Sequence, residues 1–366
     1  MRVMMSGGGT AGHIYPALTV AEELRAAGRD EVLFVGTPDG LEARLVPEAG
    51  ISFDGIPAKG FDRSRPLSLV GALIQLFAST LRATSILRME EIDVVAGFGG
   101  YVSLPVGLAA VLTRTPLALH EQNSVPGLAN RVLSRWAKSV AVTYETSRSY
   151  LRHPDRVTLT GNPVRESVLS ADALQGRLDL GVPYDAPLLL VFGGSRGARH
   201  LNQVVVAARD AWLSVPGSAI VHIAGREECA SVSAALEALG GDADGRYRVL
   251  DYADGMGSLM AAADLVVARA GATSIAEMTC LGKASVLVPY PYATDDHQTL
   301  NAKALQDAGA ALVFADSQID RPEFVEKVTE LLADGRTRAT MAAASSALGR
   351  PDAALRVADT IRGVCR

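Results

Sequence analysis

Cysteine is scarce in this sequence, and its spacing argues against the common uses of several thiols. The chain has three cysteines, Cys229, Cys280 and Cys365, which are odd in number and far apart. Disulfide frameworks and zinc sites need paired or closely spaced cysteines, so we expect neither. The pattern is typical of a protein that works in a reducing compartment.

A leader peptide and a strongly basic composition are lacking as well. The N-terminus enters an apolar strand pattern and a glycine turn at once, without the basic and apolar regions of a signal peptide, so we expect no export. The formal net charge is −5 at pH 7. Neither half of the chain is basic enough to indicate nucleic acid as a partner.

One apolar stretch, residues 67–81, is too short to cross a bilayer, which needs about 20 residues. It is flanked by Arg63, Arg65, Arg82 and Arg88. Two interpretations are open at this point. The stretch is either a buried core helix or a helix that lies in a membrane surface with its arginines near lipid headgroups.

Glycine is used in two turns of the same kind, each between an apolar strand and a helix. Residues 3–5 precede the turn at 7–13, and residues 188–192 precede the turn at 193–197. Glycine allows a tight turn and close approach of a ligand, while the helix start offers free N–H groups and a positive dipole end. Each turn therefore suits an anion, although no Gly-Lys-Ser/Thr ends a phosphate loop.

Length and apolar rhythm predict two domains of one class. A chain of 366 residues with 48% hydrophobic residues can bury two cores. Strand patterns alternate with helical ones, which predicts an α/β fold of two Rossmann-like domains facing a cleft, with parallel sheets covered by helices on both faces. The predicted strands are 3–5, 32–35, 94–96, 117–119, 140–142 and 157–159, then 188–192, 220–224, 249–250, 265–268, 285–288 and 311–314.

Two breaks divide the chain. Gly161-Asn162-Pro163 is the expected joint between the domains, because proline ends local structure and the apolar rhythm resumes after it. A second break lies at residues 348–351. We therefore expect domains at 1–161 and 162–348, and a helix at 349–366 that packs back on the first domain.

Three loops of the first half are candidates for binding. His13 closes the first turn at a helix start, where the dipole disfavours imidazolium; it is either a general base or a histidine that caps the helix or touches a phosphate. His120-Glu121-Gln122-Asn123 follows strand 117–119 and is either a ligand-binding loop or a hydrated loop in which Asn123 or Ser124 caps the next helix. Gly99-Gly100-Tyr101 is expected on the same edge.

The first turn also matches the dinucleotide fingerprint formally, through Gly7, Gly9 and Gly12. That function needs an acidic residue at the end of the second strand to bind the ribose. Here the strand ends in Val35-Gly36-Thr37, and the acids Asp30 and Glu31 precede it. NAD binding is therefore a minor alternative, and a turn that only packs a helix on a sheet is another.

In the second half, residues 269–277 leave a strand and begin a helix, which offers another anion site. Ser274 and Glu277 fit a capping box, and Glu277 alternatively accepts hydrogen bonds from a ribose diol. Asp295-Asp296-His297-Gln298 follows strand 285–288, where Gln298 suits sugar hydroxyls and the aspartates suit the cap of a helix. Adjacent acids without further ligands are weak evidence for a metal.

Glycine loops, helix starts, a candidate base and diol-binding groups together suit transfer of a sugar from a nucleotide diphosphate. Six motifs occur in order: Gly8-Gly9-Thr10-Ala11-Gly12-His13, Gly99-Gly100-Tyr101, His120-Glu121-Gln122-Asn123, Gly161-Asn162-Pro163-Val164-Arg165, Gly193-Gly194-Ser195-Arg196-Gly197-Ala198-Arg199, and Asp296-His297-Gln298 through Asn301-Ala302. Through these six motifs the chain resembles the undecaprenyl-diphospho-muramoylpentapeptide β-N-acetylglucosaminyltransferases of peptidoglycan synthesis. The resemblance covers essentially the whole chain.

The resemblance implies a GT-B glycosyltransferase that moves N-acetylglucosamine from UDP-N-acetylglucosamine to the C4 hydroxyl of undecaprenyl-diphospho-N-acetylmuramoyl-pentapeptide, with inversion. It implies that the polyprenyl-diphosphate acceptor binds the first domain and the UDP-sugar mainly the second. It also implies a peripheral position on the cytoplasmic face of the inner membrane, and it favours lipid contact for the stretch Leu67 to Leu81.

The same resemblance assigns roles residue by residue. His13 would be the base for the acceptor hydroxyl, or would lie beside it. The residues assigned to the donor are Thr10, Gly12, Arg165, Ser195, Gly271, Glu277, His297 and Gln298. Those assigned to the acceptor or the cleft are Tyr101, Glu121 and Asn123.

The chain departs from the family pattern at two positions, with Ala11 where glycine is usual and Arg196 where glutamine is frequent. We expect no metal ligand in the protein and no obligatory cofactor, with a divalent cation at most stimulatory. A UDP-sugar epimerase on the same architecture is the main alternative. An NAD-dependent oxidoreductase and a non-catalytic nucleotide-sugar binding protein follow it.

Overall fold

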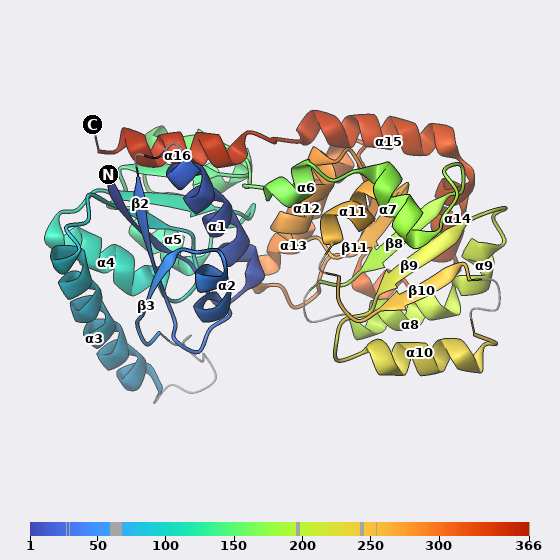
Figure 1. The fold of residues 1–366 in the computed structure, drawn as a ribbon, viewed down its shortest axis with the longest axis horizontal. Helices are drawn as coiled ribbons and strands as arrows, with labels where there is room; N and C mark the ends of the chain where they lie inside the picture. Colours follow the sequence, from blue (N-terminus) through green and yellow to red (C-terminus); the bar gives the residue numbers. More distant parts are fainter. Residues whose placement is uncertain are drawn as a thin grey trace. The chain divides into compact units, whose positions relative to one another are not determined.

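The computed structural model describes residues 1–26, 28, 30–58, 68–194, 198–241, 245–253 and 255–365, and it divides into two compact units (Figure 1). Unit 1 comprises Met1–Arg165 and Arg350–Arg366, and unit 2 comprises Glu166–Gly349. Each unit contains its own parallel sheet. The α/β class predicted from the apolar rhythm is therefore confirmed.

The sheet of unit 1 has the strand order β3-β2-β1-β4-β5-β6-β7. Its side chains alternate between two hydrophobic clusters: Val3 and Met5 of β1 face one, and Met4 faces the other. Because both faces are covered, the strands read as continuous apolar runs. The bounds are β1 Arg2–Ser6, β2 Glu31–Gly36, β3 Ser52–Gly55, β4 Val94–Gly97, β5 Leu117–Glu121, β6 Ser139–Val142 and β7 Val157–Leu159.

Helices cover both faces of this sheet. Side chains of α1 and α16 enter one hydrophobic cluster, and side chains of α3, α4 and α5 enter the other. The helices are α1 Ala11–Ala26, α2 Glu42–Glu48, α3 Ser68–Met89, α4 Ser103–Thr113, α5 Leu128–Leu133, the short 3-10 helices η1 Glu145–Tyr150 and η2 Pro154–Arg156, and α16 Ala353–Gly363.

Helix α16 (red in Figure 1) lies beside α1 (blue), although the two are at opposite ends of the chain. Val357, Ala358 and Ile361 are buried in the cluster that α1 also enters. At its end, Arg362 Nε binds Asp30 Oδ2 at 2.9 Å. The last helix is therefore an integral part of unit 1.

Unit 2 repeats the scheme with the strand order β10-β9-β8-β11-β12-β13. The strands are β8 Leu188–Phe192, β9 Ala219–Ile223, β10 Tyr247–Leu250, β11 Leu265–Ala268, β12 Ala284–Leu287 and β13 Ala311–Val313. The helices are α6 Glu166–Leu169, α7 Ala173–Leu180, α8 Arg199–Ala207, α9 Arg209–Leu213, α10 Cys229–Ala238, α11 Met256–Ala262, α12 Ala272–Cys280, η3 Thr294–Asp296, α13 His297–Asp307, η4 Asp316–Gln318, α14 Pro322–Ala333 and α15 Gly335–Leu348.

Each predicted strand is present, but two details of the prediction are wrong. Strand β3, with the sequence Ser-Phe-Asp-Gly, was not predicted because it is a short edge strand without an apolar run. Strand β5 extends to Glu121, so His120 and Glu121 lie within the strand rather than in the loop after it.

Helix α3 is not a wholly buried core helix. It packs on α4 through one face, while Leu73, Ile74, Phe77 and Leu81 on another face are at least half exposed. Among the described residues, no helix has the length and apolar character needed to cross a membrane. Leu67, Arg63 and Arg65 lie outside the described residues.

Candidate functional site

The first glycine turn lies at the carboxyl edge of the unit 1 sheet, against the loop that follows β4. Gly100 has a φ of +83°, and a Cβ atom at this position would overlap the Gly8 carbonyl oxygen. Glycine is required there for both reasons. The amide of Phe98 also donates to the Ser6 carbonyl at 2.7 Å. The loops after β1 and β4 therefore form one packed structure.

A buried carboxylate that sequence reasoning missed, Glu42 of α2, holds this turn. Its Oε1 accepts hydrogen bonds from the amide and hydroxyl of Thr37 at 2.9 and 2.6 Å, and its Oε2 accepts a long one from the Gly9 amide at 3.4 Å. The Glu42 side chain is fully buried. A dinucleotide-binding site would need an acid near the end of β2 to bind the ribose. Glu42 lies there, but its carboxylate is buried and bonded to the protein itself, so it is not accessible to a ribose.

His13 lies in the first turn of α1, and its hydrogen bonds define its tautomer. Its Nδ1 is 3.0 Å from the Gly8 carbonyl oxygen and 3.2 Å from Thr10 Oγ1. Because a carbonyl oxygen only accepts, Nδ1 carries the proton, and in the neutral ring Nε2 is then the basic nitrogen. A Cβ on Gly99 would lie 3.2 Å from that nitrogen, so the glycine loop after β4 makes room for it.

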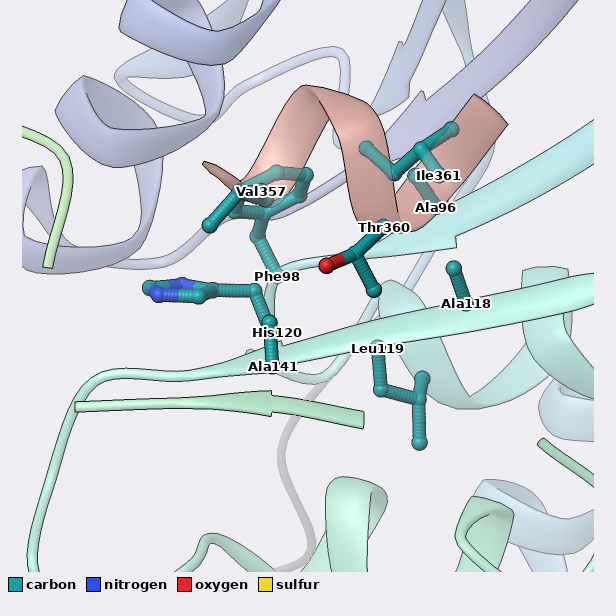
Figure 2. Close-up of a pocket in the computed structure, with 9 residues that line it drawn as sticks. All are labelled: Ala96, Phe98, Ala118, Leu119, His120, Ala141, Val357, Thr360 and Ile361. Atoms are coloured by element: carbon teal, nitrogen blue, oxygen red, sulfur yellow. The ribbon is translucent and has the colours of Figure 1, made fainter. Parts of the chain in front are cut away.

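His120 serves the architecture of this edge. Its Nε2 donates to the Gly161 carbonyl at 3.1 Å, and its Nδ1 accepts from Gln122 Nε2 at 3.2 Å. Burial lowers the pKa of His120 to about 4, so the ring is neutral at pH 7. Figure 2 shows it beside Phe98 and near Val357, in a crevice between the sheet and α16.

Glu121 organises the loop that follows β5. Its Oε1 accepts from the Asn123 amide at 3.0 Å, and its Oε2 accepts from the Gly127 amide at 3.1 Å and from Asn130 Nδ2 at 2.8 Å. The N-cap of α5 is Gly127, so the interpretation that Asn123 or Ser124 caps this helix is wrong. The carboxylate fixes the loop conformation and leaves Asn123 half-buried.

Tyr101 and Arg165, two further residues of unit 1 that were predicted to bind substrate, lie near the glycine loops and α1. Tyr101 follows the Gly99-Gly100 pair and is 64% exposed, so its ring is accessible to a ligand. The Arg165 guanidinium lies over the Tyr15 ring, 4.3 Å from its centre. Tyr15 belongs to the α1 turn after His13, so the cation is held beside the helix that carries the candidate base.

In unit 2, the loop after β11 begins α12. Gly271 is the N-cap, with extended φ and ψ angles and no side-chain cap, so the helix starts at Ala272. The capping box predicted from Ser274 and Glu277 is therefore wrong, because Ser274 lies inside the first turn. Glu277 is 4% exposed. Ser195, with Arg196 and Gly197, lies outside the described residues.

Gln298 joins two loops of the unit 2 edge. Its Oε1 accepts from the Ala270 amide at 3.2 Å and from the Tyr290 amide at 2.9 Å, which links the loops after β11 and β12. His297 Nδ1 donates to the Thr294 carbonyl at 2.8 Å, which leaves Nε2 as the acceptor of the neutral ring. The structure thus places Gln298 against the loop that leads into the N-cap Gly271.

Within the described part of the chain, no group of three or more histidine, cysteine, aspartate or glutamate side chains is arranged to hold a metal ion. Asp295 and Asp296 both have positive φ angles and are exposed.

Comparison with known proteins assigns the class. Residues 3–142 match the glycosyltransferase family 28 N-terminal domain, and residues 188–357 match the glycosyltransferase family 28 C-terminal domain. The chain belongs to glycosyltransferase family 28, and its two parallel α/β sheets have the GT-B fold. It is an enzyme of the glycosyltransferase class.

Individual proteins and solved structures similar to this chain indicate which kind of glycosyltransferase it resembles. A UDP-N-acetylglucosamine--N-acetylmuramyl-(pentapeptide) pyrophosphoryl-undecaprenol N-acetylglucosamine transferase from Halothermothrix orenii is 40% identical over 355 residues, which are 96% of this chain and 95% of that protein. The crystal structure of MurG from Acinetobacter baumannii is similar with a TM-score of 0.78 and 33% identity, covering 99% of both chains. A UDP-N-acetylglucosamine 2-epimerase structure from Listeria monocytogenes, at 16% identity and a TM-score of 0.69, shares the fold alone. The predicted resemblance to the peptidoglycan transferases is therefore confirmed.

Proposed function

We propose that this enzyme transfers N-acetylglucosamine from UDP-N-acetylglucosamine to the C4 hydroxyl of undecaprenyl-diphospho-N-acetylmuramoyl-pentapeptide, which converts lipid I to lipid II. The observation that carries the proposal is the 40% identity to a transferase of this name across nearly the whole of both chains. An epimerase function has support from the fold alone.

The acceptor hydroxyl attacks the anomeric carbon as UDP leaves, through a transition state with oxocarbenium character. His13 is the proposed base, because protonation of Nδ1 by its bond to Gly8 makes Nε2 the basic nitrogen. The oxygen–hydrogen bond of the acceptor breaks as the new glycosidic bond forms, so the proton passes to His13. The result is inversion at the anomeric carbon.

The negative charge that develops on UDP needs compensation. We assign this to the helix start at Gly271, to Ser195 and to Arg165, with Thr10, Gly12, Glu277, His297 and Gln298 completing the donor set. Preorganised donors in comparable oxyanion sites contribute roughly 3–4 kcal/mol each. The N-cap geometry of Gly271 leaves the first amides of α12 oriented outward along the helix axis, which supports this role. Tyr101, Glu121 and Asn123 are assigned to the acceptor side, where Glu121 acts by fixing the loop.

No metal ion is obligatory in this proposal, and a divalent cation is at most stimulatory. Complete loss of UDP affinity after EDTA treatment, restored by Mg²⁺, would contradict that part.

We further propose that α3 attaches the enzyme to the cytoplasmic face of the inner membrane. Its exposed side chains Leu73, Ile74, Phe77 and Leu81 form an apolar strip, and Arg82 and Arg88 of the same helix are exposed cations suited to anionic headgroups.

The test is a transfer assay on the pure protein with UDP-N-acetylglucosamine and a synthetic short-chain lipid acceptor, analysed by mass spectrometry. We expect one hexosamine added to the acceptor, and UDP release only when both substrates are present. Conversion of UDP-N-acetylglucosamine without an acceptor would instead indicate the epimerase. Quenching of NADH fluorescence on binding would indicate the oxidoreductase.

A further inference from the structure

A charged network ties together the carboxyl ends of four adjacent strands of unit 2. Arg269 follows β11, and its Nη1 donates to the carbonyls of Val288 and Pro289, just after β12, at 3.2 and 3.1 Å. The same nitrogen forms an ion pair with Asp316 Oδ1 at 2.6 Å, in the segment after β13. Asp316 Oδ2 lies 2.8 Å from Nδ1 of His200 on α8, the helix after β8.

His200 is held by carboxylates at both ring nitrogens. Its Nε2 lies 2.9 Å from Asp320 Oδ2, while its Nδ1 faces Asp316. Ionised carboxylates only accept hydrogen bonds, so both contacts exist together only when both nitrogens carry protons. A neutral ring satisfies only one of the two ionised carboxylates, whereas an imidazolium satisfies both at once.

The charges around the ring favour that state. The hydrogen bond to Asp316 is the largest influence and raises the pKa of His200, which burial opposes and Asp320 reinforces. Burial disfavours the charge of Asp316, but bonds from His200 and Arg269 outweigh it and lower the pKa of that carboxyl. Asp316 and Asp320 are the charged groups that act on His200, and Arg269 approaches from the far side of Asp316.

The network reaches the loop that begins α12. Arg269 directly precedes Ala270 and Gly271, and the Ala270 amide donates to Gln298. Arg269 is 8% exposed, so its guanidinium has a fixed position between the loops after β11 and β12. A neutral His200 donates from one nitrogen only, and it must then release either Asp316 or Asp320. Release of Asp316 by His200 removes one of the contacts that fix this carboxylate, which is the ion-pair partner of Arg269.

We propose that His200 is a positioning residue that makes the affinity of unit 2 for UDP depend on pH, acting through Asp316 and Arg269 on the loop 269–271. The imidazolium fixes the loop in its binding geometry, and its deprotonation loosens the loop. Affinity for UDP is therefore high at low pH, where His200 is protonated. It decreases as the pH rises and His200 loses its proton. The inference rests on the proposed function, in which unit 2 binds the UDP-sugar.

The experiment measures the dissociation constant of UDP by calorimetry from about pH 6 to about pH 9 in the full chain and in variants. For the unmodified enzyme we expect affinity to fall about three- to tenfold as pH rises, the scale of one charge-assisted contact. His200→Asn should bind weakly at all pH values and lack this change. Asp320→Asn removes one carboxylate from a largely exposed position, and it should move the transition to lower pH.

His153→Asn, a histidine of unit 1 outside the site, is the matched control and should follow the unmodified enzyme. If His200→Asn and the unmodified enzyme show parallel pH curves, the inference is wrong although UDP binds. An unmodified enzyme that does not bind UDP at any pH contradicts the proposed function itself. If His200→Asn does not fold, the Asp320→Asn curve decides, because an unshifted transition there also overturns the inference.

Discussion

At the scale of single residues, the first glycine turn depends on the carboxylate of Glu42. We predict that Glu42→Gln lowers the free energy of unfolding by about 2 kcal/mol, since hydrogen bonds to charged groups contribute about 1.5–3 kcal/mol. In glutamine, an NH₂ group replaces one carboxylate oxygen, so it would face the N–H group of either Thr37 or Gly9. Two hydrogen-bond donors would then face each other without an acceptor. Because the Gly8 carbonyl orients His13, kcat should fall about tenfold, with a smaller change in KM for UDP-N-acetylglucosamine.

The control for this change is Glu48→Gln on the same helix, where the side chain is exposed and pairs with Arg44. Exposed pairs of this kind contribute about 0–1 kcal/mol, so stability and kcat should be nearly unchanged. Equal kinetics for the two variants would show that Glu42 does not position the turn.

A buried histidine in unit 2 predicts acid sensitivity. His222 Nδ1 accepts from the Tyr247 hydroxyl at 2.9 Å, and its Nε2 donates to Asn202 Oδ1 at 3.0 Å. Burial lowers the pKa of His222 from 6.5 to about 4. The unfolded chain therefore binds a proton first as pH falls, so this stabilisation is complete above pH 6.5 and is lost progressively toward pH 4, by about 3 kcal/mol at most.

The measurement uses a tryptophan that reports unit 2 alone. Trp212 is fully buried in the unit 2 core, and Trp136 is the second tryptophan of the chain. In a Trp136→Phe background, urea unfolding followed by fluorescence should give lower stability at about pH 5 than at about pH 7.5. His222→Gln should reduce this difference, and an unchanged difference would assign the acid sensitivity to other groups.

At the scale of elements, α3 combines a face packed on α4 with an apolar face left exposed. Ile74 and Phe77 are 65% and 66% exposed. Full burial of such a side chain contributes roughly 1.5–3 kcal/mol, so Ile74→Ser with Phe77→Ser should weaken binding to anionic phosphatidylglycerol vesicles by about tenfold or more. Co-sedimentation with vesicles measures this, and transfer to a water-soluble acceptor should persist.

Leu178→Ser on α7 is the matched control, because it removes an apolar side chain of equal exposure, 65%, from unit 2. Its vesicle binding should equal that of the unmodified enzyme. Equal losses in both variants would indicate nonspecific adhesion rather than attachment through α3.

Elements with continuous apolar runs were predictable, while contacts between distant residues were not. Strands such as β8 and β11 are buried on both faces, which makes their sequence uniformly apolar. Strand β3 lies at the sheet edge and lacks that signal.

Contacts between residues far apart in the sequence could not be predicted. Glu42 bonds to the glycine turn over a separation of 33 residues, and His200 contacts Asp316 over a separation of 116, so local sequence patterns reveal neither contact. His13 could be predicted as a candidate base because the helix start beside it is visible in the local sequence, and the structure places it in the first turn of α1.

At the scale of the whole molecule, unit 1 is built from both ends of the chain. We predict that a chain ending at Gly349 keeps a folded unit 2 that still binds UDP, whereas unit 1 is destabilised and transfer is lost. The missing helix α16 carries Val357 and Ile361, which are 1% and 2% exposed, and loss of one such side chain costs about 2–5 kcal/mol. Trp136 in a Trp212→Phe background reports unit 1, and an unchanged transition there would contradict the prediction.

The return of α16 also sets an order of events during synthesis. When residues 1–165 have left the ribosome, the sheet face that α1 covers still lacks its second helix, α16, and unit 2 is completed before α16 emerges. The nascent N-terminal portion therefore keeps apolar surface exposed while nearly two hundred further codons are translated. Chaperones that shield such surface would be needed most in that interval, until α16 emerges and completes the portion made first.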